Sequence, residues 1–174
     1  MLYKTKGIII KNSNLADVDR LITIYTNDFG KLVIKGKSVR KNQAKLKGHL
    51  ELFLYSHLMI APGRGFDIIT GAETIKFFSY LRENLNHLFV AHYFSELIDK
   101  LIVGPEKDEN IWQLLLNSFK QLDQKEADIK LIVSNFENRF SQFLGYGQQK
   151  DFISFAESIA NSKINSYQNL IKML

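Results

Sequence analysis

The chain has no cysteine, only two prolines, and no long apolar run among its 174 residues. Without cysteine it can form neither a disulfide nor a cysteine-ligated zinc site. No apolar run approaches the ~20 residues that a membrane-spanning helix needs. Residues 1–11 alternate charged with apolar side chains, which is unlike a secretion signal. We therefore expect a cytoplasmic protein that makes no contact with a membrane.

Side chains that could carry catalysis or hold a metal are also sparse. The four histidines are scattered, and His87 and His92 are five residues apart, so they would not share one face of a helix. Asp17 and Asp19 could hold a metal only with a third ligand, and none is near them in the sequence. No serine or lysine shows the surroundings of an activated nucleophile. We expect a binding protein that is not an enzyme and needs no cofactor.

Acidic residues are missing from one strongly basic stretch, residues 31–48, which holds seven Lys or Arg side chains. Its beginning, 31–35, is β-prone and is followed by a glycine, so we predict a strand that leads into a surface loop. A cationic strand end and loop suit a polyanion, because each cation that meets a phosphate releases condensed counterions. A solvated loop without a ligand is the competing interpretation. The predicted nucleic-acid contacts are Lys4, Lys6, Lys31, Lys35, Lys37, Arg40, Lys41, Lys45, Lys47 and Arg64.

Charge is unevenly divided along the chain. Residues 1–75 carry 12 Lys or Arg against 6 Asp or Glu, a net charge of +6, whereas residues 76–174 carry 11 against 12, a net of −1. The apolar pattern also changes near residue 75, from the period of strands to the period of helices. We therefore predict two domains, a nucleic-acid-binding domain over 1–75 and a helical domain over 76–174.

The first domain is predicted to be a five-stranded barrel of the OB type. Its strands alternate or are rich in β-branched residues, and turn residues separate them. Five strands in about 70 residues, with a long connection between the third and fourth, are typical of that barrel. The predicted strands are 2–11, 21–26, 31–35, 50–61 and 66–70.

The second domain is predicted to be entirely helical, which makes the fold class α+β. Its apolar residues recur every three or four positions, and the run over 88–102 is apolar nearly all round, as in a buried central helix. The predicted helices are 77–85, 88–102, 111–122, 129–144, 152–159 and 164–174.

Several short segments, in this order, resemble the RecO family of bacterial recombination mediators. The series covers about 145 residues of the chain. The segments are Lys6-Gly-Ile-Ile-Ile10, Ala16-Asp-Val-Asp-Arg-Leu21, Phe29-Gly-Lys31, Leu46-Lys-Gly48, Gly63-Arg-Gly65, Ala72-Glu73, and Phe143-Leu-Gly-Tyr146.

That resemblance implies an OB-fold domain followed by a helical domain. It also implies binding of single- and double-stranded DNA, annealing of complementary strands, and work with RecR and single-strand-binding protein to load RecA. A protein of this kind would be cytoplasmic and associated with the nucleoid when it is on DNA. Many members continue after the Leu-Gly-Tyr step into a cysteine zinc module; this sequence has no cysteine, so we expect a short form without that module.

Two other functions fit the same residues. A barrel of this type could serve as a protein-interaction adaptor that binds no nucleic acid, or it could bind RNA, because phosphate contacts do not distinguish the sugar. Tyr3, Tyr25 and Phe29 could stack on bases, or they could pack in the barrel. The resemblance further implies a groove in the helical domain for the acidic, hydrophobic tail of single-strand-binding protein. The cations available for that tail are Lys100, Lys120, Lys130 and Arg139.

Overall fold

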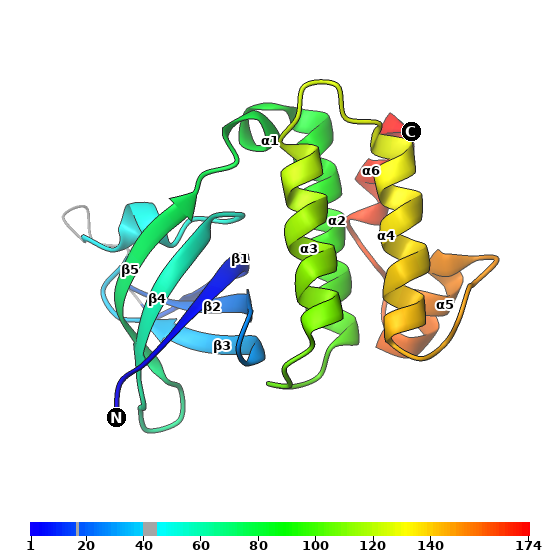
Figure 1. Cartoon of the computed structure of the whole chain (residues 1–174). Coiled ribbons are helices and arrows are strands. Elements are labelled where there is room, and N and C mark those ends of the chain that lie inside the picture. The colour runs from blue at the N-terminus through cyan, green and yellow to red at the C-terminus, as the bar shows by residue number, and fades with distance from the viewer. Residues whose placement is uncertain (17, 40–44) are drawn as a thin grey trace. The chain divides into compact units, whose positions relative to one another are not determined.

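The computed structural model describes residues 1–16, 18–39 and 45–174 of the chain (Figure 1). The chain divides into two compact units. The barrel unit comprises Met1–Phe77 together with Gly104–Asp108, and the helical unit comprises Phe78–Val103 and Glu109–Leu174.

The barrel unit is a closed sheet in the order β1-β2-β3-β5-β4. All neighbouring strands are antiparallel except β3 and β5, which run parallel where Lys35 meets Ile68. This arrangement of five strands is an OB-type barrel, so the predicted fold of this part of the chain is confirmed. The strands are β1 (Tyr3–Leu15), β2 (Asp19–Thr26), β3 (Gly30–Gly36), β4 (Tyr55–Ala61) and β5 (Ile68–Lys76).

Strand β1 closes the barrel because it pairs with two different neighbours. Its first part, Tyr3–Ile8, pairs with β4, and its second part, Gly7–Leu15, pairs with β2. The register with β2 shifts between Ile9 and Lys11, so one residue is inserted there as a bulge. A bulge bends a strand and increases its twist, which allows a single strand to serve both sides of a closed sheet.

The barrel core is aliphatic. Ile22, Ile24 and Ile34 point inward from β2 and β3 and are fully or almost fully buried. The long connection between β3 and β4 also contributes to this core, since Val39 and Leu50 are buried in it and Leu46 packs against it. A short 3₁₀ helix, Lys47–His49, lies within that connection.

The predicted strand over 50–61 is wrong in its first half, because β4 begins only at Tyr55. Phe53 has a φ of 67°, in the left-handed region that a strand does not use. The Phe53 N–H donates to the Ile9 carbonyl oxygen (2.8 Å) and the Ile9 N–H donates to the Leu54 carbonyl oxygen (3.1 Å). The segment therefore satisfies the backbone of β1 at its bulge, while Leu50 and Leu54 fill the core.

The helical unit is built around α2, whose residues are mostly buried. Asn84 caps its N-terminus by accepting hydrogen bonds from the N–H groups of Asn86 and His87. In the core, the rings of Phe94 and Phe136 stack with centroids 3.8 Å apart, which joins α2 to α4. Within the described residues, no helix is long and apolar enough to cross a membrane. The helices are α1 (Ser79–Glu83), α2 (Leu85–Leu101), α3 (Glu109–Leu122), α4 (Ile129–Phe143), α5 (Phe152–Ala160) and α6 (Tyr167–Met173).

Two predicted boundaries between strand and helix also need correction. The sequence predicts that the fifth strand ends at residue 70 and that the first helix begins at residue 77. Strand β5 instead continues to Lys76, with Glu73 paired to His57 of β4, and the first helix begins at Ser79. The second half of β5 has few aliphatic side chains, so its apolar pattern alone does not mark it as a strand.

Candidate nucleic-acid interface

The outer face of β1, β2 and β3 is the surface on which a nucleic acid would be expected in this fold. Because Ile22, Ile24 and Ile34 point inward, their alternate neighbours point outward. Two cross-strand rows result: Val33 pairs with Thr23, which pairs with Lys11, and Lys35 pairs with Leu21, which pairs with Ser13. We call this surface the outer face.

Lys11 is a cation of the outer face that the sequence analysis missed. Strict alternation counted from the buried Ile9 would place Lys11 inside the barrel. The bulge between Ile9 and Lys11 reverses the alternation, and Lys11 is exposed next to Thr23. The half-buried side chain of Asn12 confirms the reversal, because its amide donates to the carbonyl oxygen of the core residue Leu50 (3.1 Å). No signal in the sequence marks the bulge.

The predicted contacts do not all lie together. Lys4 and Lys6 are exposed on the part of β1 that pairs only with β4, opposite Met59 and His57. Arg64 is exposed on the loop between β4 and β5. The remaining predicted cations lie on β3 or in the connection that follows it, except that Arg40 and Lys41 lie outside the described residues. They are Lys31, Lys35, Lys37, Lys45 and Lys47.

One end of the outer face is covered by the segment Gly104–Asp108 of the barrel unit. Gly30 begins β3 with a φ of +68°, and a Cβ built on it would lie 2.0 Å from the Glu106 carbonyl oxygen. The neighbouring Tyr25 is buried, and its pKa is raised by burial and by the charges of Asp108 and Glu106. Lys31 pairs across from Tyr25 and so lies at the covered, acidic end.

The opposite end of the outer face carries an ion pair. The Lys35 ammonium lies 2.8 Å from Asp19 Oδ2, and the Ser38 N–H donates to Asp19 Oδ1 (2.6 Å). The hydrogen bond from Lys35, followed by that from Ser38, lowers the pKa of Asp19. Lys35 is therefore committed to a carboxylate, whereas Lys37 is exposed on the turn that follows. Lys45 and Lys47 flank Leu46, whose side chain packs on the core, so both are held beside the barrel.

The aromatic residues proposed for base stacking are mostly engaged in packing. Tyr25 is buried, and the Tyr3 hydroxyl donates to Asp67 (2.6 Å) while its ring packs edge-on against Phe29, centroids 5.1 Å apart. Phe66 is 44% exposed on the β4–β5 loop and Val33 is 39% exposed on the outer face, and neither is among the predicted contacts. Their exposure depends on tertiary position, which their residue type does not reveal.

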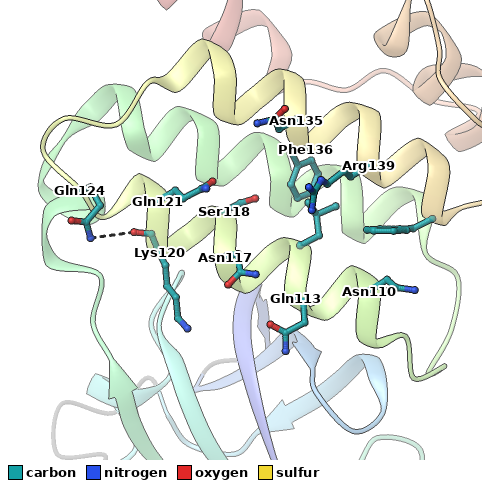
Figure 2. Close-up of a pocket in the computed structure, with 12 residues that line it drawn as sticks. Asn110, Gln113, Asn117, Ser118, Lys120, Gln121, Gln124, Asn135, Phe136 and Arg139 are labelled. Atoms are coloured by element: carbon teal, nitrogen blue, oxygen red, sulfur yellow. Dashed lines mark hydrogen bonds between the residues drawn. The ribbon is translucent and has the colours of Figure 1, made fainter.

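The helical unit has a groove between α3 and α4 with a volume of about 520 Å³. Figure 2 shows Arg139 reaching from α4 toward α3 beside Phe136, and Lys120 pointing away from α4. None of the residues that line the groove is acidic. Apart from Lys120 and Arg139 they are amides, one hydroxyl and three apolar side chains: Asn110, Gln113, Leu114, Asn117, Ser118, Gln121, Gln124, Asn135, Phe136 and Phe143.

The other cations predicted for a groove do not line this one. Lys100 lies 2.8 Å from Glu96 and donates to the Lys163 carbonyl oxygen, so it belongs to the contact between α2 and the segment before α6. Lys130 is exposed on α4 outside the lining. Across the described part of the chain, no three His, Asp or Glu side chains gather in a way that could hold a metal.

Comparison with known proteins matches both units to one family. The family model "Recombination protein O N terminal" matches residues 1–78, and "Recombination protein O C terminal" matches residues 82–152. The chain is 36% identical over 146 residues to "DNA repair protein RecO" of Dehalococcoides mccartyi, an alignment that covers 83% of this chain and 56% of the relative. It is 33% identical over 148 residues to the protein of that name from Roseiflexus, covering 85% of this chain and 52% of the relative. The chain thus spans about half the length of these relatives.

Proposed function

Because this chain belongs to the RecO family of DNA repair proteins, we propose that its barrel unit binds single- and double-stranded DNA and that the protein is a recombination mediator, not an enzyme. In this role it anneals complementary strands and works with RecR and single-strand-binding protein to load RecA. The protein is then cytoplasmic, and it is associated with the nucleoid when it is bound to DNA.

The observation that carries the DNA-binding proposal is a set of cations on the outer face and in the connection that follows it. Lys11 is exposed in the row that it shares with Thr23 and Val33, Lys37 is exposed on the turn after β3, and Lys45 and Lys47 follow in the connection to β4. Asp19, an acid at the end near Lys37, is already paired with Lys35. A phosphate backbone laid across this surface would therefore meet cations and one neutralised pair, which favours binding by counterion release.

The test is a fourfold variant that replaces Lys11, Lys37, Lys45 and Lys47 with Gln. Four lost phosphate contacts should reduce the slope of log affinity against log salt by roughly 3 for single-stranded DNA, at about 0.7 for each contact. The matched control carries the same change of charge at four exposed lysines of the helical unit. The control residues are Lys125, Lys130, Lys150 and Lys172.

The assay is a fluorescence titration of labelled oligonucleotides over a series of salt concentrations, with circular dichroism to confirm the fold. The control should bind like wild type, and the outer-face variant should lose both affinity and slope. Equal binding by both variants would contradict the DNA site and leave the protein-interaction adaptor as the better function. Titration with RNA of the same sequence separates DNA binding from the RNA-binding alternative.

For the protein partner we propose that the α3–α4 groove takes the acidic, hydrophobic tail of single-strand-binding protein. The supporting features are Arg139 as a cation, the apolar side chains of Phe136 and Phe143, and amides that can pair with a peptide backbone. Calorimetry with a tail peptide should give heat with the whole chain. Binding should weaken in Arg139→Gln but persist in Lys130→Gln, whose side chain lies on the same helix outside the groove. Equal affinity of the two variants for the peptide would contradict the proposal that the peptide binds in this groove.

A further inference from the structure

We infer that Asp19 is a positioning residue for DNA binding: through Lys35 and Ser38 it fixes the turn that presents Lys37 to the phosphate backbone. The inference rests on the proposed function and adds to it, because it separates Lys35 from the cations that meet DNA. In this arrangement Lys35 acts through Asp19, and Lys37 makes the contact.

The first support is the geometry of the Asp19 carboxylate, whose two oxygens have different partners. Oδ2 lies 2.8 Å from the Lys35 ammonium and Oδ1 accepts the Ser38 N–H at 2.6 Å. The Asp19 side chain is only 13% exposed, so both contacts are partly shielded from water and from salt. Asp19 lies at the start of β2, opposite Leu15 of β1, so the carboxylate projects from a strand that is paired in the sheet.

The second support is that the turn after β3 is anchored on both sides of Lys37. Gly36 packs closely on the core, since a Cβ there would lie 2.9 Å from the Ile22 Cδ1 and 3.1 Å from a Val39 methyl. Val39 is buried in the barrel core. Ser38 between them has a φ of 57°, a left-handed conformation that costs a non-glycine residue energy unless its surroundings hold it. The hydrogen bond to Asp19 supplies that hold.

These contacts divide the two neighbouring lysines by role. Lys37 is exposed on a turn whose backbone is fixed, so it can meet a phosphate without first ordering its own backbone. To meet a phosphate, Lys35 would have to break its ion pair with Asp19. The Asp19 carboxylate would then lie unpaired beside the DNA and repel it. The charge of Lys35 and that of Asp19 cancel, so removing both leaves the net charge of the face unchanged.

The test compares Asp19→Ala/Lys35→Met, which is neutral overall, with Lys37→Met, by titrating single-stranded oligonucleotide at several salt concentrations. Lys37→Met should reduce the salt slope by about 0.7. The double variant should keep the wild-type slope yet bind about tenfold more weakly, the cost of ordering roughly one backbone residue on binding. Lys35→Arg, which preserves the ion pair, should behave as wild type.

Two results would overturn the inference. A double variant with wild-type affinity would make the Asp19–Lys35 pair a surface pair without a role in binding, and a slope reduced by about 0.7 would make Lys35 a direct phosphate contact. If the double variant fails to fold, Asp19→Asn/Lys35→Met takes its place, because it keeps an acceptor for the Ser38 N–H. Its salt slope should equal that of the wild type, and a slope reduced by about 0.7 would again make Lys35 a direct phosphate contact. Absence of salt-dependent DNA binding in the wild type would instead refute the proposed function itself.

Discussion

Replacing Gly30 with alanine should destabilise the barrel unit far more than a glycine substitution at a similar backbone conformation elsewhere. Gly30 has a φ of +68°, and an added Cβ would lie 2.0 Å from the Glu106 carbonyl oxygen and 2.7 Å from its carbonyl carbon. These are backbone atoms, so no side-chain rotation relieves the overlap. The segment Gly104–Asp108 would have to move by about 1 Å to restore even the shortest contact that packed atoms tolerate.

The magnitude has two parts. A left-handed conformation costs alanine about 1–2 kcal/mol. Overlap in a packed interior costs typically 1–3 kcal/mol more. Gly147 provides the matched control, because its φ is also +68° and nothing lies within 4 Å of a Cβ built there. Gly147→Ala should therefore show only the first part, about 1–2 kcal/mol.

The assay is urea unfolding followed by circular dichroism and by the fluorescence of Trp112, the single tryptophan, which is buried in α3. Circular dichroism responds to both units, whereas Trp112 reports the helical unit, so the two signals show which unit the substitution affects. A Gly30→Ala variant no less stable than Gly147→Ala would refute the close contact between β3 and the Gly104–Asp108 segment.

Three further outcomes follow from single contacts. Ser38→Gly should change the free energy of unfolding by less than about 1 kcal/mol in thermal melts. Glycine adopts the left-handed conformation without strain, but its greater conformational entropy in the unfolded chain opposes that gain. Glu137→Gln should raise the stability near neutral pH and flatten its pH dependence: burial raises the pKa of Glu137 against the hydrogen bond from Tyr93, so stability is lost as pH rises through the folded pKa. Burial raises the pKa of Glu96, but hydrogen bonds from Lys100 and Ser166 outweigh burial and lower that pKa overall. The stability that Glu96 contributes is therefore present above its unfolded pKa and is lost as the pH falls through its folded pKa. Limited proteolysis of α6 across a pH series would detect this loss.

The sequence predicted the fold class because its apolar patterns are strong where elements are long. The central helix over 88–102 corresponds to α2, and the amphipathic patterns over 111–122 and 129–144 correspond to α3 and α4. Each of these patterns arises from burial of one face or of the whole helix, which residue type reveals directly. The OB-type barrel was predicted from five short strands and is confirmed by the closed sheet.

The errors arose where an apolar pattern has two structural meanings. Leu50, Leu52 and Leu54 alternate as in a strand, but their segment turns through the left-handed Phe53 and caps the core instead. Lys11 follows a buried isoleucine at strand spacing and yet points outward because of a bulge. Both features depend on hydrogen bonds between distant parts of the chain, so local period cannot reveal them.

The bulge and the Gly104–Asp108 segment together restrict where a phosphate backbone could lie on the proposed binding surface. The segment closes the hairpin end of the outer face and brings the charges of Glu106 and Asp108 near Tyr25 and Lys31, where they oppose an anion. The bulge adds Lys11 to the outer face between its two ends, in the row of Thr23 and Val33. Lys4 and Lys6 lie on the part of β1 that pairs with β4, outside that row. Cations that look equivalent in the sequence are therefore unequal in the part of the barrel that the structure describes, because the strand register decides which of those on the strands share a surface.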